Sequence, residues 1–573
     1  MSGPPGALAY SWQRPLGAVV DGASTSFRVW CTRPVAVGFA SATVSLEPAG
    51  FDVWEAQAEV GHGEDYWFIV DGEKLADPCS RWQPLGLDGP SRVFDPSSFA
   101  WSDAGFRSPT LGESVIYELH VGTFTAQGTL DAAVGELERL AALGVTTVEL
   151  MPLAEGPGEH GWGYDGVYIS AVSHAYGGPA ALQRFVDAAH RAGLAVLLDV
   201  VYNHLGASGG GELAKFGPYF TDAHTTLWGG AINFCERDCD PVREWVAQSA
   251  AGWIRDFHID GLRLDAIDAI YDESPRHIVS EVAERVHAID QRALVIAEAG
   301  LNDARVIRPT GLGGLGCDAQ WADEFQHALH ALLTGERDGY YADFGSVGDL
   351  AKALRRPFVN DGGYSKFRRR LFGAPADDRP PSQFVVCSQN HDQVGNRALG
   401  DRLPADVRGL AAFCVLLAPF VPLLFMGEEY GESAPFQFFS DHTDPEIAEA
   451  TRVGRAREFA HFGGFTGEVP DPQDPATFLA SKLTRRRDGE LESLYAALIR
   501  WRQVLSGEVE LIELDEESSW LRLRRGEHEM ICNFAEEPQT FGVSGAEVLL
   551  ATAACAVVGE QLELTGRAAV LLG

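Results

Sequence analysis

Gly261-Leu-Arg-Leu-Asp265, Leu294-Val-Ile-Ala-Glu298 and Phe384-Val-Val-Cys-Ser-Gln-Asn-His-Asp392 are three apolar runs that each end in an acid. Each run is short enough to be a buried strand, which puts the acid at its carboxyl end. Parallel strands that close into a barrel bring their carboxyl ends to one mouth, where catalytic groups lie. Three carboxylates at such a mouth suit a reaction that passes through a cation, and glycoside cleavage is the leading example.

A fourth run of the same kind strengthens this interpretation. Residues 194–204 form another apolar run, and its Asp199, Asn203 and His204 are expected near the same rim. One acid after a strand is usually a helix cap or a loop residue, but four such strands in one chain make that reading improbable. Arg263 lies two residues before Asp265 and therefore on the same strand face, where it is expected to hold that carboxylate ionised.

Four ordered motifs carry a family resemblance. They are Asp199-Val-Val-Tyr-Asn-His204, Gly261-Leu-Arg-Leu-Asp265, Ala297-Glu298 and Asn390-His391-Asp392, and they resemble the motifs of the alpha-amylase family of glycoside hydrolases. Within that family the chain resembles the maltooligosyltrehalose trehalohydrolases. The narrower likeness rests on residues 115–125, 161–166, 389–397 and 435–442, and it extends over essentially the whole chain.

The resemblance implies roles for individual residues. Asp265 matches the nucleophile, Glu298 the general acid/base, and Asp392 the third acid that stabilises the transition state. The residues expected to bind substrate are Arg263, His204, His391, Tyr164, Asp165, Asn203, Trp228 and Phe438. Two positions depart from the family pattern: many amylases carry Lys-His shortly after the nucleophile, where this chain has residues 266–269 with Asp268 among them, and Gly300 stands where trehalohydrolases often carry an acid.

Composition limits the classes of partner. The chain has 573 residues and a formal net charge of −36, which argues against binding to nucleic acid or to anionic membrane surfaces. Its nine cysteines are scattered, and only Cys235 and Cys239 form a close pair, so free thiols in a reducing compartment are expected. The first ten residues show no secretory signal, and a cytoplasmic location is predicted. The oligomeric state is left open.

The pattern of apolar runs predicts an α/β fold in three parts. Residues 1–97 read as an immunoglobulin-like β-sandwich, residues 105–500 as a (β/α)8 barrel with long loops at 205–239 and 322–383, and residues 505–573 as a second β-sandwich. Within the second long loop, the basic run 366–370 favours a solvated helix face over an anion site. Eight barrel strands are expected, at 115–120, 145–151, 194–201, 261–265, 294–298, 315–321, 384–389 and 421–426. Helices between them are expected to begin at Thr129, with Gly144 as the stop, at Asp240-Pro241 and at Ser274-Pro275.

The strand-end acids predict a retaining glycoside hydrolase, and the family resemblance implies that it cleaves the α-1,4 bond next to a terminal trehalose unit and requires no cofactor or catalytic metal. Asp265 attacks the anomeric carbon, and Glu298 protonates the departing oxygen. Two alternatives stay open at this point. One is a glycogen branching or debranching enzyme, and the other, of a different class, is a non-catalytic glucan-binding protein.

Overall fold

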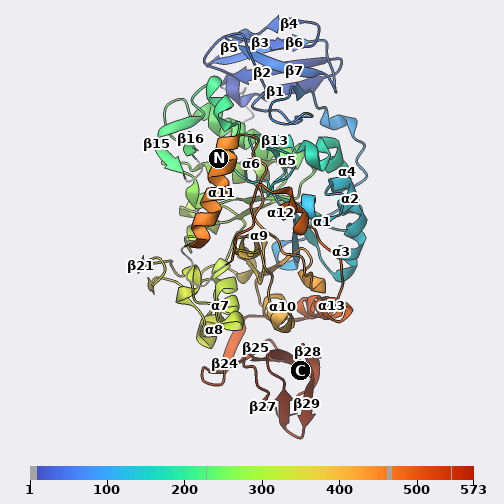
Figure 1. The fold of residues 1–573 in the computed structure, drawn as a ribbon, viewed down its shortest axis with the longest axis vertical. Helices are drawn as coiled ribbons and strands as arrows, with labels where there is room; N and C mark the ends of the chain where they lie inside the picture. Colours follow the sequence, from blue (N-terminus) through green and yellow to red (C-terminus); the bar gives the residue numbers. More distant parts are fainter. Residues whose placement is uncertain (1–9, 227–228, 461–466, 544) are drawn as a thin grey trace.

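The protein consists of a central barrel with a β-domain at each end (Figure 1). The computed structural model describes residues 10–226, 229–460, 467–543 and 545–573. The N-terminal domain, the barrel and the C-terminal domain follow one another along the longest axis of the molecule. Of the helices in these described ranges, none is long and apolar enough to cross a membrane.

The eight barrel strands pair in parallel and close in the order in which they occur in the chain. They are β10 (Ile116–Leu119), β11 (Thr147–Leu150), β14 (Ala195–Val200), β17 (Gly261–Leu264), β18 (Leu294–Ala297), β19 (Ala319–Trp321), β22 (Phe384–Cys387) and β23 (Val421–Phe425). This confirms the eight predicted strands, although β19 is shorter than its predicted range. The lower interior is packed with apolar side chains such as Leu197, Ile296 and Val385. The barrel is therefore a filled core that leaves only its mouth for chemistry.

The helix predicted from Thr129 to Gly144 is divided by a 3-10 turn at Val134–Glu136, although both of its predicted ends are present. Thr129 caps α2 (Leu130–Ala133) by accepting from the Ala132 N–H, and Gly144 ends α3 (Leu137–Leu143) with a φ of 106°. Helix α5 (Asp240–Phe257) begins at the predicted Asp240-Pro241 and covers the barrel with a long buried face. Because α5 packs on the barrel, the strand that follows it, β17, pairs in parallel with β14.

The two long barrel connections contain regular structure that the sequence analysis did not predict. Residues 322–383 contain helices α7 (Asp323–Thr334) and α8 (Val347–Ala353), because Phe325, Ala328 and Leu329 recur at helical spacing and are buried. The loop 205–239 holds a two-stranded hairpin, β15 (Phe220–Thr226) with β16 (Gly229–Ile232). The helix expected from Ser274 starts later, as α6 (Ile278–Ile289).

The basic run Lys366 to Arg370 was also misread, because it is no helix. It forms the connection between two short strands, β20 (Tyr364–Ser365) and β21 (Arg370–Leu371). Arg368 within it donates from Nη2 to the carbonyl oxygen of Gly300 over 2.8 Å. That contact brings the connection to the edge of the barrel mouth.

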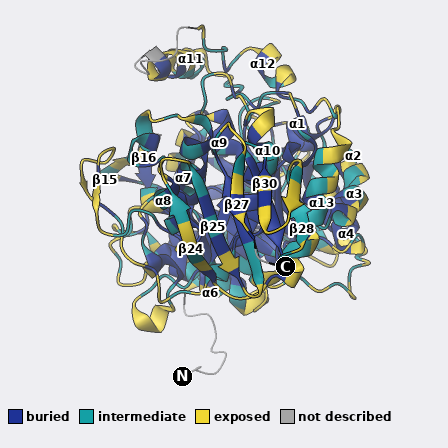
Figure 2. Cartoon of the chain, turned by 90° about the horizontal axis from the view of Figure 1, so that it is seen from below, coloured by how far each residue is buried: buried dark blue, intermediate teal, exposed yellow. Residues whose placement is uncertain are grey.

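Each end of the chain forms two sheets. At the N-terminus they are ordered β1-β2-β6-β5 and β4-β3-β7-β8, and at the C-terminus β24-β25-β26-β31-β28 and β27-β30-β29. The strands are β1 (Gly17–Asp21), β2 (Ser24–Trp30), β3 (Val35–Gly38), β4 (Thr43–Ser45), β5 (Glu47–Gly50), β6 (Val53–Ala58), β7 (Asp65–Val70), β8 (Glu73–Leu75), β24 (Val509–Asp515), β25 (Trp520–Arg525), β26 (His528–Asn533), β27 (Gln539–Gly542), β28 (Val548–Ala551), β29 (Cys555–Val558), β30 (Gln561–Leu564) and β31 (Ala568–Leu572). Buried residues concentrate along the strands, and exposed ones on outer helices and connections (Figure 2). The residue limits set for the three domains stay a prediction.

Candidate active site

Three acids stand at the carboxyl ends of barrel strands, as their positions in the sequence predicted. Asp265 follows β17, Glu298 follows β18, and Asp392 lies in the first turn of α9 (His391–Gly395), shortly after β22. Their side chains are 11%, 20% and 34% exposed, so each is packed on most sides yet open toward the mouth. A group that must touch a substrate needs this partial exposure.

Arg263 lies under the acids and is fully buried. Its Nη1 donates to Asp265 Oδ1 over 2.8 Å and to both carboxylate oxygens of Asp199, and its Nη2 donates to Glu298 Oε2 over 2.8 Å. The ring of Trp321 packs against the guanidinium, with 4.3 Å between ring centroid and Cζ. The predicted pairing of Arg263 with Asp265 is present, but the sequence did not reveal that the same side chain also holds Glu298. The planar guanidinium group of Arg263 therefore fixes the relative position of Asp265 and Glu298.

Two further donors orient these acids. Asn203 donates from Nδ2 to Asp265 Oδ2 over 2.7 Å, so this carboxylate is held from two sides. The backbone N–H of Ala266 donates to Glu298 Oε2 over 2.8 Å. Ala266 adopts a φ of 37°, in the left-handed region that an alanine rarely occupies. Such strain persists only where the surrounding structure enforces it, and here it aims an N–H at the neighbouring strand.

Burial favours the protonated forms of Glu298 and Asp199. It raises the pKa of Glu298 above the ordinary glutamate value, and the positive charge of Arg263 opposes but does not cancel this effect. Burial also raises the pKa of Asp199 to about 7, again against the influence of Arg263. Glu298 thus has the environment of a group that holds a proton to give away.

His391 is enclosed by polar partners. Its Nδ1 lies 2.5 Å from Glu118 Oε1 and its Nε2 lies 2.7 Å from the hydroxyl of Tyr164, which donates in turn to Asp199 over 2.6 Å. Burial lowers the pKa of His391, but the charges of Asp392 and Glu118 outweigh it, and the pKa is raised to about 10. His391 therefore carries a positive charge beside Asp392. Sequence reasoning missed Glu118, although a charged residue inside the apolar strand β10 was a usable signal.

The other predicted binding residues lie around this centre, with one exception. His204 is buried and its Nε2 lies 3.0 Å from the carbonyl oxygen of Tyr164; burial lowers its pKa to about 4, so it is neutral. Asp165 lies 3.7 Å from His442, measured from Oδ2 to Nε2. Phe438 packs edge-on against Trp162, whose ring in turn meets His391. Trp228 lies outside the described residues.

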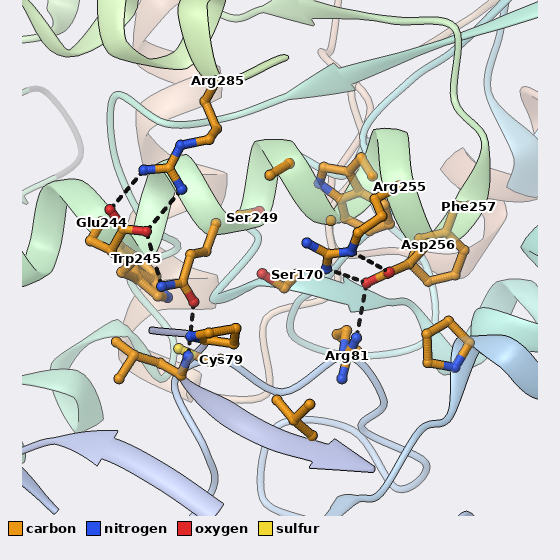
Figure 3. A pocket seen from close by; sticks show the side chains of 18 of the residues that line it. Cys79, Arg81, Ser170, Glu244, Trp245, Ser249, Arg255, Asp256, Phe257 and Arg285 are labelled. Carbon is orange, nitrogen blue, oxygen red and sulfur yellow. Dashed lines mark hydrogen bonds and ion pairs between the residues drawn. The ribbon is translucent and has the colours of Figure 1, made fainter. Parts of the chain in front are cut away.

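A cavity of about 480 Å³ lies away from the acids, between the N-terminal domain and α5 (Figure 3). Its charged residues pair with one another: Glu244 with Arg285, and Asp256 with both Arg81 and Arg255. Each of these carboxylates is already satisfied by a guanidinium. The geometry is that of a packed domain junction, and it brings no reactive group to the acids at the barrel mouth.

A smaller cavity adjoins Glu298. It is lined by Ala299, Gly300, Trp321, Asp323 and Tyr340, and by Arg368 from the connection that was misread as a helix. The sequence analysis did not single out Asp323 or Tyr340, because residues 322–383 were read as a long loop. An acid two residues after a barrel strand, of the kind that marked Asp265, was the missed signal.

Known proteins resemble this chain over most of its length. A model of the alpha-amylase catalytic domain matches residues 93–210, and a model of a domain of unknown function, DUF3459, matches residues 487–571. The malto-oligosyltrehalose trehalohydrolase of Rhizobium sp. (strain M-11) is 46% identical over 92% of each chain, and that of Arthrobacter ramosus is 48% identical over 79% of this chain and 82% of its own. The crystal structure of a putative alpha amylase from Salmonella typhimurium superposes with a TM-score of 0.89 at 35% identity, covering 97% of this chain and 99% of that one.

The acid constellation at the barrel mouth and these relatives agree on the chemistry. A (β/α)8 barrel whose fourth and fifth strands deliver Asp265 and Glu298 to one guanidinium has the arrangement that glycoside cleavage by two carboxyl groups requires. The chain belongs to the malto-oligosyltrehalose trehalohydrolase family of glycoside hydrolases, within the alpha-amylase group.

Proposed function

We propose that this enzyme hydrolyses the α-1,4 glucosidic bond next to the terminal trehalose unit of a maltooligosyltrehalose and releases trehalose. The substrate is supported by the relatives, whose names state it and which are similar over most of the chain. The mechanism is supported by one observation above the others: Asp265 and Glu298 are both hydrogen-bonded to the guanidinium of Arg263. That contact keeps a nucleophile and an acid close together, as retention of configuration requires.

In the first step Asp265 attacks the anomeric carbon of the sugar on the non-departing side. An ester bond forms between its carboxylate oxygen and that carbon while the glycosidic bond breaks. Glu298 gives its proton to the departing oxygen, which leaves as the hydroxyl group of trehalose. Arg263 and Asn203, which were expected to bind substrate, are buried beneath Asp265, and we assign them instead the role of orienting its attacking oxygen.

In the second step Glu298, now ionised, takes a proton from water. The oxygen of that water attacks the anomeric carbon, and the ester bond to Asp265 breaks. Two displacements on one carbon restore the α configuration. Both steps pass through a sugar that carries positive charge, which the carboxylate of Asp392 stabilises at close range.

The remaining site residues are proposed to bind the sugars. The rings of His391 and His204 are proposed to pack against the sugar near the cut bond, with the aromatic ring of Tyr164 stacked on His391 at 5.2 Å between ring centroids. Asp165 lies at the rim, where its carboxylate accepts hydrogen bonds from sugar hydroxyls. Phe438 and Trp228 are proposed to contact the departing disaccharide.

We also propose a cytoplasmic location. All nine cysteines fall within the described residues and none of them is joined in a disulfide. Five of the nine thiols are buried, among them Cys387 in the barrel interior. Free thiols in this number favour a reducing compartment. Localisation of a tagged full-length chain in its own cells tests this point directly.

Product analysis tests the proposed reaction. The enzyme is incubated with a trehalose-capped maltooligosaccharide, the uncapped oligosaccharide of equal length, and glycogen. Release of trehalose from the capped substrate supports the proposal, and the Asp265→Ala variant controls for contaminating activity. A branching enzyme would change the chain-length distribution of glycogen without new reducing ends, and a non-catalytic glucan-binding protein would leave all three substrates unaltered.

A further inference from the structure

A fourth carboxyl group lies beside the cleavage centre. Asp323 is the first residue of α7 and follows the sixth barrel strand, β19, with one residue between them. It lines the small cavity that Ala299 and Gly300, the two residues after Glu298, also line. Across the described parts of the chain, no side chain or backbone group forms a hydrogen bond or ion pair with its carboxyl oxygens. Asp323 thus presents an unpartnered carboxyl group to the Glu298 side of the site.

Asp323 interacts electrostatically with the catalytic acids. Burial, together with the negative charges of Glu298 and Asp392, raises its pKa to about 7 against the opposing charge of Arg263. The titratable and charged groups around it are Glu298, Asp392, Arg263, Glu324, His327, Tyr340, Asp343, Arg368 and Cys387. Near neutral pH Asp323 is therefore present in both protonation states, and the neutral carboxyl both donates and accepts hydrogen bonds.

A purely structural role does not account for this placement. An acid in the first turn of a helix stabilises the helix dipole, typically by about 0.3–1 kcal/mol. The next residue, Glu324, has a clear structural function, because it accepts hydrogen bonds from the backbone N–H groups of Val359 and Asn360 and from the Asn360 side chain. Asp323 has no such partner and faces the cavity instead.

The position of the cavity indicates which sugar of the substrate it contacts. Asn203, His204 and Tyr164 surround the Asp265 side of the centre, where the sugar that becomes bound to the enzyme lies. Two residues that directly follow Glu298, Ala299 and Gly300, line the cavity, and Glu298 is the group proposed to protonate the departing oxygen. The sugar nearest this cavity is then the leaving group. Its hydroxyl groups are the natural partners of a carboxyl group that has none in the protein.

We propose that Asp323 is a binding residue for the departing sugar, whose carboxyl group hydrogen-bonds one of that sugar's hydroxyl groups beside Glu298. This inference rests on the proposed function, because it takes Glu298 as the proton donor. Under this proposal Asp323 contributes to kcat/KM only when the leaving group is a sugar. A leaving group without hydroxyl groups gains nothing from it.

The test compares two substrates. A trehalose-capped maltooligosaccharide loses a sugar that can contact Asp323, whereas α-maltosyl fluoride loses fluoride, which has no hydroxyl group. Asp323→Ala should lower kcat/KM for the capped oligosaccharide about 10- to 100-fold, the effect of losing one hydrogen bond to a charged or shared-proton group. Its kcat/KM for the fluoride should change less than about threefold, because fluoride forms no hydrogen bond with Asp323 and its departure does not need a proton from Glu298. Asp323→Asn, whose amide still bonds a hydroxyl, should recover part of the loss.

A control variant tests for loss of stability, and trehalose release by the wild-type enzyme tests the proposed function separately. Asp240→Ala removes the acid at the same position of α5, far from the acids, and reports the effect of a lost helix-terminal charge on melting temperature. Equal losses on both substrates, or no loss on the capped one, would overturn the role of Asp323. A wild-type enzyme that releases no trehalose would instead overturn the proposed function. The role of Asp323 would then still be tested with uncapped maltooligosaccharide against the fluoride.

Discussion

Arg263 and Glu298 are joined by a 2.8 Å hydrogen bond from Nη2 to Oε2. The same guanidinium donates from Nη1 to Asp265 over 2.8 Å, so a single buried cation organises both acids. Burial still raises the pKa of Glu298, because a charge shared among three carboxylates does not fully offset the desolvation of each. The arrangement places the two carboxyl groups on one cation and favours the protonated form of Glu298, which a general acid needs.

Replacement of Arg263 should cost both stability and activity. Arg263→Gln leaves Asp199, Asp265 and Glu298 without their common cation, and breaking a buried pair in this way typically destabilises a protein by about 3–5 kcal/mol. Arg263→Lys keeps the charge but has one nitrogen in place of the fork, so it should retain more stability while losing most turnover. Urea unfolding and kcat/KM measured on the same preparations test this, and a Gln variant with wild-type stability would refute it.

Each of the three acids should be essential for turnover. Asp265→Ala, Glu298→Gln and Asp392→Asn should each reduce kcat by at least about 10²–10³, the typical loss for one transition-state contact, while the fold persists. Azide should restore activity to Asp265→Ala by taking the place of the missing nucleophile and forming a glycosyl azide. Near wild-type kcat in any one variant would remove that residue from the mechanism.

The pair of His391 and Glu118 should make stability depend on pH. The pKa of His391 is raised to about 10 by charges that outweigh burial, above the ordinary histidine value of 6.5. Its contribution to stability is therefore complete below about pH 6.5 and is lost as pH rises through about 10. Glu118→Gln removes one of those charges, so the stability gap between wild type and this variant should be largest near pH 6.5 and should shrink toward pH 10.

Thermal unfolding at a series of pH values checks this sign. A gap that widens with rising pH would mean that His391 is neutral in the folded protein. Glu513→Gln, an exposed acid in the C-terminal domain, is the matched control and should show no such trend.

Phe438 should influence which substrate is preferred more than it influences bond cleavage. It lies in a segment that follows β23 at the rim, packed edge-on against Trp162 with ring centroids 5.2 Å apart. Phe438→Ala should lower the ratio of kcat/KM for capped over uncapped oligosaccharides, because the pocket fitted to the departing disaccharide loses a wall. The kcat/KM for α-maltosyl fluoride should change little. An unchanged ratio would remove Phe438 from the proposed subsite.

The strands and their acids were predictable because their signals are local. A short apolar run such as residues 261–264 can only be buried, and the residue after it must lie at a strand end. The order of strands in a closed parallel barrel then brings Asp265 and Glu298 to neighbouring positions without further information. The end of α3 at Gly144 followed from the same kind of reasoning, since glycine readily adopts the φ of 106° found there and other residues rarely do.

What the sequence did not reveal depends on contacts between distant segments. Glu118 and His391 are 273 residues apart, and nothing near either of them indicates the other. The same holds for Arg368 and Gly300, which meet across 68 residues. Helix α7 was missed for a different reason: Phe325, Ala328 and Leu329 carry a readable helical pattern, but it was passed over in favour of a loop.

The most direct test of the account is the ratio of kcat/KM for a trehalose-capped maltooligosaccharide to that for the uncapped oligosaccharide of equal length. Trehalose is bent and has no reducing end, so a site shaped for it leaves polar groups unpaired when maltose takes its place. The account predicts a ratio clearly above one, with trehalose as the released disaccharide. Equal values for the two substrates would contradict it and would leave a retaining glucan hydrolase without preference for the trehalose end.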